Sequence, residues 1–340
     1  MKCHGCQASA RAGRPVAGAG AFGARGDALC AMVVLWFATV TFPAEKPTES
    51  RRAPAAVRVR ATTMIPGPEG DPLSMPSDVA VGPEGSLYVL DGVHHRVVVY
   101  DAEGQFRFQF GSEGEGPGQF RLPLGIATAP DGKVYVADSG NHRFQILSAE
   151  GKPLDAIPLP AADTGVLPDP TDVAVDARQA RLYIADNDNH RLCVYDLTHR
   201  RFQEAWGGPG LGRFQFRFPF LLDITPDGYV LVVEPINTRV QVFNTGGKFV
   251  GFIGDWGVKA GQLFRPKGVT TWQDRVFVTD SYLGRVQVFN LRGDFLGVLA
   301  DRAGAPVKLT TPTGITCDGS RKRLYVAELK ADRVCRMDLE

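Results

Sequence analysis

The fold is decided by the stretch Pro123-Leu-Gly-Ile-Ala-Thr-Ala-Pro-Asp-Gly-Lys-Val-Tyr-Val-Ala-Asp138-Ser-Gly-Asn-His-Arg143-Phe-Gln-Ile-Leu-Ser148. Residues 134–137 and 144–147 are rich in β-branched, aromatic and other apolar side chains, which favour strands. The run before them ends at Pro130-Asp131-Gly132, a turn sequence in which proline presets φ and glycine accepts a positive φ. The stretch therefore predicts three short strands joined by tight turns.

The same pattern returns at a nearly constant period. Six times an acidic residue is followed five positions later by arginine, and successive acidic members lie 47, 48, 48, 46 and 48 residues apart. Such a period indicates a repeat architecture. A feature built six times is more typical of scaffold than of a chemical site, so we expect each arginine to tie its hairpin to backbone or acidic groups. The pairs are Asp91/Arg96, Asp138/Arg143, Asp186/Arg191, Glu234/Arg239, Asp280/Arg285 and Glu328/Arg333.

Each unit also holds a fourth strand. The turn Ala149-Glu150-Gly151 follows the third run, and its counterpart at 102–104 leads into Phe106, Phe108 and Phe110, which alternate with polar residues. Four short antiparallel strands in about 47 residues match one propeller blade. The sequence therefore predicts an all-β fold, a six-bladed β-propeller. A β-sandwich explains the six-fold recurrence poorly.

The predicted ring needs a closing strand, because an open ring leaves two sheet edges exposed. The sixth unit ends after its third strand, and an alternating run, Val57-Arg-Val-Arg-Ala61-Thr62, precedes the first unit. The spacing from Thr63 to Pro76 equals that from Phe110 to Pro123. We therefore expect this N-terminal run to be the outer strand that completes the last blade.

The units resemble NHL repeats. Asn-His-Arg occurs at 141–143 and 189–191, after Tyr-(Val/Ile)-Ala-Asp at 135–138 and 183–186, and Gly-Gln-Phe-Arg-Leu-Pro at 118–123 is also typical. The resemblance covers residues 55–340 and implies a six-bladed propeller. It leaves the function open, because such propellers serve in protein binding, RNA binding, extracellular sensing, and lyase or hydrolase chemistry.

We expect three parts in the chain. Residues 1–44 are predicted to be a leader, either a signal peptide or a signal anchor, since the apolar run 28–42 suits a signal-peptide core and is short for a spanning helix. Residues 45–54 form a linker, and residues 55–340 form the propeller. This organisation predicts an extracytoplasmic protein (secreted, periplasmic or membrane-anchored through an uncleaved leader), or a cytoplasmic one if the start codon is placed too early.

Charge argues against a nucleic-acid partner. Beyond residue 52 the chain carries 31 basic and 34 acidic residues, a net charge of −3. Proteins that bind nucleic acid normally present a basic face, because phosphate neutralisation supplies much of the affinity. We therefore regard RNA binding as the third hypothesis for this chain, although a local basic patch is compatible with a neutral total.

The cysteines suggest no chemistry. Cys3 and Cys6 lack the further ligands of a zinc or haem motif and lie in the predicted leader. Cys193, Cys317 and Cys335 are predicted to be small buried hydrophobic residues without a disulfide.

Strand direction sorts the loops onto two faces. The loop after the second strand and the link to the next blade leave from one end of each blade, which we call the link face, and the two short turns leave from the other. Three histidines, His95, His142 and His190, occupy equivalent link-face loops. Such loops lie on the order of 12–15 Å from the axis, whereas zinc ligands lie about 2 Å from one ion. We therefore expect hairpin or surface roles, not a three-histidine metal site.

Residues that break the repeat are better functional candidates. Asp78 and Asp172 begin inner strands where blades 2, 5 and 6 have glycine, so their carboxylates are candidates for binding a cation or polar ligand at the channel mouth, or for capping turns. The other ligand or partner candidates lie in the aromatic link 207–220, on blades 4 and 5, and beside the first loop histidine. They are Arg213, Phe214, Phe216, Trp256, Tyr282 and His94.

Three hypotheses for the function follow. The first is a noncatalytic, exported propeller that binds a protein or small-molecule ligand on the link face, without a cofactor. The second is a propeller-type lyase or hydrolase with a metal, such as calcium or zinc, or a general base at the channel mouth. The third is RNA binding. No catalytic residue is assigned, because a propeller site gathers single residues from several blades and leaves no linear motif.

Overall fold

The computed structural model describes residues 55–340, so the predicted leader and linker lie outside the described residues. Strand β1 spans Ala55–Pro66. Blade 1 contains β2 (Asp78–Val81), β3 (Leu87–Asp91), β4 (Arg96–Tyr100) and β5 (Phe106–Phe110); blade 2, β6 (Pro123–Thr128), β7 (Val134–Asp138), β8 (Arg143–Leu147) and β9 (Pro153–Pro158); and blade 3, β10 (Pro170–Asp176), β11 (Arg181–Asp186), β12 (Arg191–Asp196) and β13 (Arg201–Gly207).

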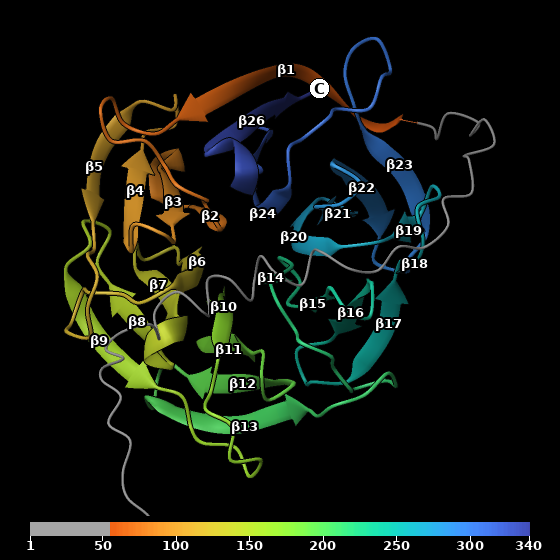
Figure 1. The fold of residues 1–340 in the computed structure, drawn as a ribbon. Coiled ribbons are helices and arrows are strands. Elements are labelled where there is room, and N and C mark those ends of the chain that lie inside the picture. The colour runs from red at the N-terminus through yellow and green to blue at the C-terminus, as the bar shows by residue number, and fades with distance from the viewer. Residues whose placement is uncertain (1–54) are drawn as a thin grey trace, which may run out of the picture. The chain divides into compact units, whose positions relative to one another are not determined.

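The second half repeats the arrangement. Blade 4 contains β14 (Leu222–Ile224), β15 (Val230–Glu234), β16 (Arg239–Phe243) and β17 (Phe249–Ile253); blade 5, β20 (Pro266–Trp272), β21 (Arg275–Asp280), β22 (Arg285–Asn290) and β23 (Phe295–Ala300); and blade 6, β24 (Pro312–Asp318), β25 (Arg323–Glu328) and β26 (Arg333–Leu339). A short pair, β18 (Asp255–Trp256) and β19 (Gln262–Leu263), lies in the link before blade 5. Figure 1 shows the six blades arranged around a central axis.

Within each blade the strands pair antiparallel in chain order, as predicted. The predicted closing strand is confirmed, because β1 pairs antiparallel with β26 from Val59 to Pro66. The structure adds a second contact: residues 55–58 of β1 pair in parallel with β23 of blade 5. Blades 5 and 6 are therefore joined through β1 into one eight-stranded sheet.

The core is divided among the seams between blades. Six clusters of buried apolar side chains each join two consecutive blades, as in the cluster that brings Phe144 of blade 2 against Tyr195 of blade 3. The ring centroids of these two residues lie 5.1 Å apart in an edge-to-face arrangement. Each blade is thus stabilised by both neighbours, and the ring has no free sheet face.

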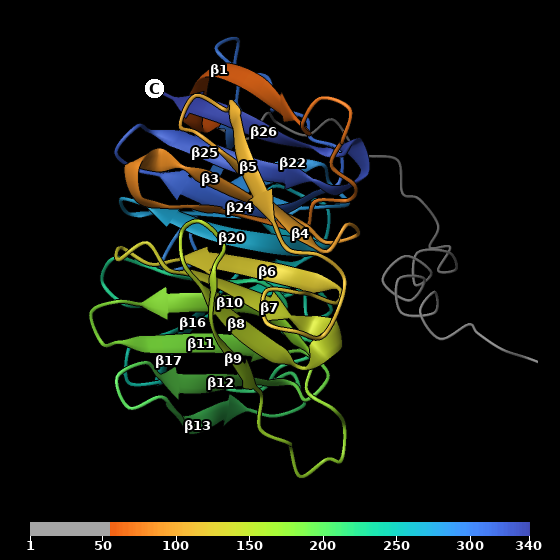
Figure 2. The same cartoon turned by 90° about the vertical axis from the view of Figure 1, so that its left-hand side faces the viewer.

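The loops gather on two opposite faces, because the strands of each blade run between them (Figure 2). Helical structure among residues 55–340 is limited to three single-turn 3₁₀ segments, at 83–85, 139–141 and 329–331. In this part of the chain, no helix has the length and apolar character needed to cross a membrane.

Candidate functional site

The repeated acidic residues are buried hubs of the link face. In blade 2, Asp138 is fully buried, and its Oδ1 accepts a hydrogen bond from the backbone amide of Arg121 in the preceding link at 2.7 Å. Arg143 Nε donates to Asp138 Oδ2 at 2.7 Å, and the same guanidinium donates to the backbone oxygens of Glu115, Gly116 and Gln119. The pair therefore fastens the link to the hairpin, which confirms the structural role predicted for it.

Five of the six pairs form this ion pair. The Nε to carboxylate distances are 2.7–2.9 Å in blades 1, 2, 3, 4 and 6. In blade 5, the side chain of Arg285 instead donates to the backbone oxygens of Val258 and Lys259, at 3.5 and 3.4 Å. Asp280 accepts backbone amides of its own loop and of the preceding link. Blade 5 therefore departs from the repeat at the hub itself.

The loop histidines also hold links in place. His95 Nδ1 accepts the Leu122 amide at 3.2 Å, and His190 Nδ1 accepts the Phe218 amide at 3.1 Å. His142 Nδ1 lies 2.6 Å from the Pro168 oxygen. Each contact joins the loop of one blade to the link that leads into the next blade.

The candidate His94 braces its own loop. Its Nδ1 lies 2.9 Å from Asp91 Oδ2, where blades 2, 3 and 4 place an asparagine amide on the equivalent acid. Within residues 55–340, no group of three or more His, Cys, Asp or Glu side chains is arranged to hold a metal ion. Cys193 and Cys335 are buried, Cys317 is half-buried, and all three are free thiols.

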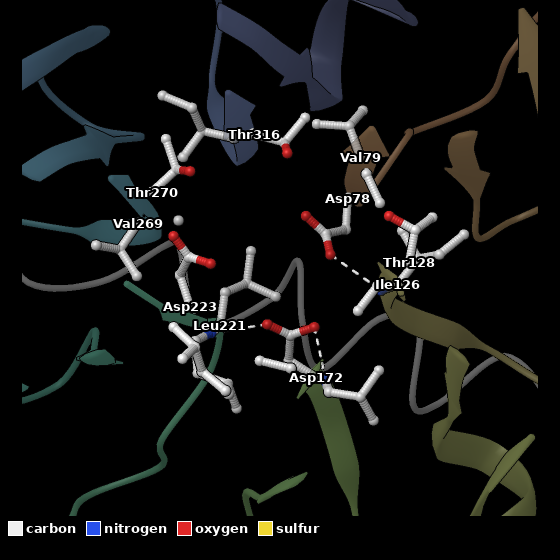
Figure 3. A pocket seen from close by; sticks show the side chains of 18 of the residues that line it. Asp78, Val79, Ile126, Thr128, Asp172, Leu221, Asp223, Val269, Thr270 and Thr316 are labelled. Atoms are coloured by element: carbon white, nitrogen blue, oxygen red, sulfur yellow. Dashed lines mark hydrogen bonds between the residues drawn. The ribbon is translucent and has the colours of Figure 1, made fainter. Parts of the chain in front are cut away.

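The central channel is lined by three carboxyl groups. It encloses a cavity of about 240 Å³, and Asp78, Asp172 and Asp223 lie around it (Figure 3). They come from blades 1, 3 and 4. Asp78 and Asp172 are almost fully buried, with 6 and 3% of their surface exposed. The structure thus brings the two predicted acidic candidates to one cavity and adds a third.

Two of these carboxylates accept hydrogen bonds from a neighbouring blade. Asp78 Oδ2 accepts the Ile126 amide of blade 2 at 3.0 Å, and Asp172 Oδ2 accepts the Leu222 amide of blade 4 at 2.7 Å. Each carboxylate also fills the space beside a glycine of the preceding blade. A Cβ atom at Gly125 would lie 2.2 Å from Asp172 Oδ1, and one at Gly314 would lie 2.0 Å from Asp78 Oδ1. The glycines that replace aspartate at this position in blades 2 and 6 are therefore part of the packing between blades.

Burial also changes the acidity of these groups. Loss of hydration raises the pKa of Asp78 to about 7, against backbone amides that stabilise its charged form. Burial likewise raises the pKa of Asp172 well above its usual range, with the charge of Asp78 adding to the effect. The pKa of Asp223 is raised to about 7, again mainly by burial. The three carboxyls therefore hold protons more readily than exposed aspartates do.

Asp223 was not among the residues chosen from the sequence. It lies on the inner strand of blade 4, two positions after Leu221. The residues equivalent to Asp223 in the other five blades are Ala80, Ala127, Ala174, Thr270 and Thr316. A carboxyl side chain at a position otherwise held by small residues was the available signal. Lys267, at the start of β20, was also missed. Its Nζ lies 4.3 Å from the centre of the Phe220 ring, and burial lowers its pKa to about 8.

The aromatic candidates separate into buried and exposed residues. Phe216 is fully buried in the cluster between blades 3 and 4, beside Phe243, so a partner cannot reach it and its choice as a contact residue was wrong. Phe214 is half-buried against the same cluster. Trp256 and Tyr282 are 66 and 63% exposed on the link face of blade 5.

Arg213 is exposed, and its guanidinium lies 5.5 Å from the centre of the ring of Phe249, the first residue of β17. Of the ligand and partner candidates, Arg213, Trp256, Tyr282 and His94 are therefore exposed, and Phe214 is partly so. The channel aspartates and the exposed aromatic residues form two separate candidate sites.

Fold comparisons place the chain among β-propellers. It aligns with a gluconolactonase from Xanthomonas campestris with a TM-score of 0.61 and 15% identity, over 88% of this chain and 99% of that one. It aligns with a streptogramin B lyase with a TM-score of 0.59 and 13% identity, over 82 and 98% of the two chains. At this identity the similarity establishes the fold alone.

The sequence comparison identifies the repeat. The NHL repeat family matches residues 73–100, 120–147 and 167–195, which lie in blades 1, 2 and 3. Blades 1, 2 and 3 of this β-propeller therefore carry NHL repeats. The chain is 33% identical over 94 residues to mouse peptidyl-glycine alpha-amidating monooxygenase and 42% identical over 48 residues to the Drosophila melanogaster protein brain tumor. These segments are 26 and 14% of this chain, and they span only 10 and 5% of the two relatives.

Proposed function

We propose that this propeller is a noncatalytic binding protein that holds a protein partner on its link face. The observation that carries the proposal is the distribution of exposed apolar side chains. Nine of the fourteen large exposed apolar residues within 55–340 belong to link-face loops, and the other five lie on outer strands. The nine are Val93, Val166, Leu167, Leu211, Phe218, Ile236, Trp256, Val258 and Tyr282.

This distribution is what a protein-binding face requires. The short turns of the opposite face contribute none of the fourteen residues, so the asymmetry does not follow from loops being exposed in general. Exposed apolar side chains that gather on one face of a protein are candidates for an interaction surface. Trp256 and Tyr282 are the residue types that most often supply the main binding energy of an interface.

The test is affinity capture with matched variants. Wild-type protein should retain a specific partner from an extract of its own cells. Trp256→Ala and Tyr282→Ala should each weaken retention by about thirtyfold, the effect of losing roughly 2 kcal/mol from an aromatic anchor. Arg292→Ala, on the opposite face of the same blade, should bind like wild type. Equal retention by all variants would contradict the proposal.

The proposal includes an extracytoplasmic location, which rests on the apolar run 28–42 of the sequence. Fractionation of cells with an antibody to the propeller should find the protein in the membrane, the periplasm or the medium. Recovery in the cytoplasm alone would contradict this part of the proposal.

A second candidate function is acid–base chemistry in the channel. The observation that favours it is the pKa of about 7 at Asp78 and Asp223, since a group with a pKa near the working pH can both donate and accept a proton. The fold similarity to a gluconolactonase and a lyase suggests the substrates to try first. Turnover of a sugar lactone that is lost in Asp223→Asn would support an enzyme, and absence of turnover by the wild type would leave the binding function.

A further inference from the structure

The link face is electrically divided. The links and loops of blades 1–3 contain seven acidic residues and one basic residue, Arg121. These segments are 67–77, 92–95, 111–122, 139–142, 159–169 and 187–190. In those of blades 4–6 (208–221, 235–238, 254–265, 281–284, 301–311 and 329–332), seven basic residues face three acidic ones. The Asp/Glu–Arg pairs lie outside these segments. We call the two regions the acidic half and the basic half.

The basic half contains exposed basic side chains that form no ion pair with a residue among 55–340. Arg213, Arg217, Lys259 and Lys308 are exposed, and none of them forms an ion pair with another residue among 55–340. Two of the three acidic residues of this half are engaged by backbone amides. Asp332 Oδ1 accepts the Met75 amide at 2.7 Å, and Asp301 Oδ1 accepts the Ala305 amide at 2.8 Å.

The acidic half is compensated only in part. Glu115 forms an ion pair with Arg121 at 2.7 Å, and Asp71 forms one with the hub residue Arg96. Glu69, Glu113, Asp163 and Asp188 are exposed without an ion pair to a described residue. A negatively charged partner is therefore attracted to one half of the face and repelled by the other.

The apolar residues follow the same division. Six of the nine exposed apolar residues on the link face belong to the basic half: Leu211, Phe218, Ile236, Trp256, Val258 and Tyr282. The ring of Tyr282 lies 4.3 Å from that of Phe264, which belongs to the same link as Trp256 and Lys259. Exposed cations and exposed apolar residues thus both belong to the links and loops of blades 4 and 5.

From this arrangement we infer that the partner is a protein with an acidic segment that carries apolar side chains, and that this segment docks on the basic half. The inference rests on the proposed binding function of the link face and specifies its partner. Unpaired Arg213, Arg217 and Lys259 would meet the carboxylates of the segment, while its apolar residues pack on Trp256 and Tyr282. The acidic half would set the orientation by repulsion.

An acidic segment fits better than a nucleic acid. A polyanionic strand gains affinity from many phosphate contacts along its length. On this face such a strand would soon pass from the basic half to the acidic half, because the six blades form one ring. A short acidic segment whose carboxylates all lie over blades 4–6 avoids repulsion by the acidic half.

The experiment uses three labelled probes and the whole chain. The first probe is a sixteen-residue peptide in which Glu alternates with Leu and Trp, the second has Lys in place of Glu, and the third is a sixteen-nucleotide poly(U) RNA. We expect the Glu peptide alone to bind, with an affinity that falls as salt rises. The double variant Arg213→Glu/Lys259→Glu should bind it at least about tenfold more weakly, while Glu113→Lys/Asp163→Lys should not lose affinity.

Three results would overturn the inference: no binding of the Glu peptide, tighter binding of poly(U), or self-association of the protein through this face in sedimentation. The captured partner separates this inference from the proposed function. If capture is lost in Trp256→Ala but is unchanged by salt and by Arg213→Glu/Lys259→Glu, the link face binds a protein and the acidic-segment inference is wrong. If capture is unaffected by Trp256→Ala, the proposed function itself fails.

Discussion

Asp280 and Arg285 occupy the positions of an ion pair that forms in the other five blades, yet in blade 5 the two side chains do not pair. Asp280 accepts the amides of Phe264, Tyr282 and Leu283, and Arg285 donates to carbonyl oxygens of the preceding link. The Nε atom of Arg285 is buried without a partner, and burial lowers the pKa of this arginine. Blade 5, which presents the exposed aromatic residues, therefore has a differently built hub.

The broken pair predicts unequal costs for two equivalent substitutions. Arg143→Ala removes the partner of fully buried Asp138 together with three hydrogen bonds to the link, and should lower the free energy of unfolding by about 3 kcal/mol. Arg285→Ala should cost no more than about 1 kcal/mol. Urea denaturation of both variants measures the difference, and equal losses would show that the missing ion pair is energetically irrelevant.

The channel carboxyls predict a pH-dependent variant. The pKa of Asp78 is raised to about 7 in the folded protein, so the fold favours the protonated form, and the contribution of Asp78 to stability falls as pH rises from about 4 to about 7. Asp78→Asn keeps a side-chain oxygen that can accept the Ile126 amide. Because asparagine stays neutral at every pH, this variant never has to bury a charge. The free energy of unfolding of this variant, relative to that of the wild type, should therefore rise by on the order of 2 kcal/mol between pH 5 and pH 8.

Asp131→Asn is the control for this pH effect. A hydrogen bond with Lys133 lowers the pKa of exposed Asp131, so its stabilising effect is present at neutral pH and fades on acidification. The free energy of unfolding of this variant should not rise relative to that of the wild type at pH 8. Parallel stability–pH curves for Asp78→Asn and the wild type would contradict the raised pKa.

The closing strand predicts the effect of truncation. A chain that begins at Met64 lacks most of β1, including buried Val57 and Val59, and loses the contact with β23. Burial of two valine side chains is worth roughly 3–6 kcal/mol, so this chain should melt at a much lower temperature than one that begins at Ala55. Similar melting temperatures in calorimetry would mean that β1 does not hold the ring closed.

The buried and exposed aromatic residues predict opposite phenotypes. Phe216→Ala should lower the free energy of unfolding by about 3–5 kcal/mol, because it leaves a cavity between blades 3 and 4. Trp256→Ala should leave stability within about 0.5 kcal/mol of wild type, since its side chain is 66% exposed. Thermal unfolding compares the two, and a stable Phe216→Ala protein would show that the seam can collapse around the missing ring.

Much of the fold could be predicted from the sequence because it repeats. Turn residues and the Asp/Glu–Arg spacing are local signals, and the Asp/Glu–Arg spacing recurs in all six units. The closing strand followed from the missing fourth strand of blade 6. Its second contact, with β23, could not be predicted, because it depends on where the ring brings residues 55–58.

The site was predicted less completely, for physical reasons. Asp78 and Asp172 stood out against glycine, but their interblade hydrogen bonds depend on the distance between neighbouring inner strands, which no local pattern encodes. Asp223 was masked by the irregular start of blade 4. In the aromatic link, the alternation of phenylalanines does not show which side faces the seam, so the burial of Phe216 required the packed structure.

The position of β1 has a consequence for how the protein is made. Its antiparallel partner, β26, is synthesised only after blades 1–5, and the amide of Glu340 donates to the oxygen of Arg58. Strand β1 must therefore wait for β26, while blades 1–5 can form in order behind it. Completion of the ring is therefore a single late event, because β1 lacks its antiparallel partner until β26 has been made.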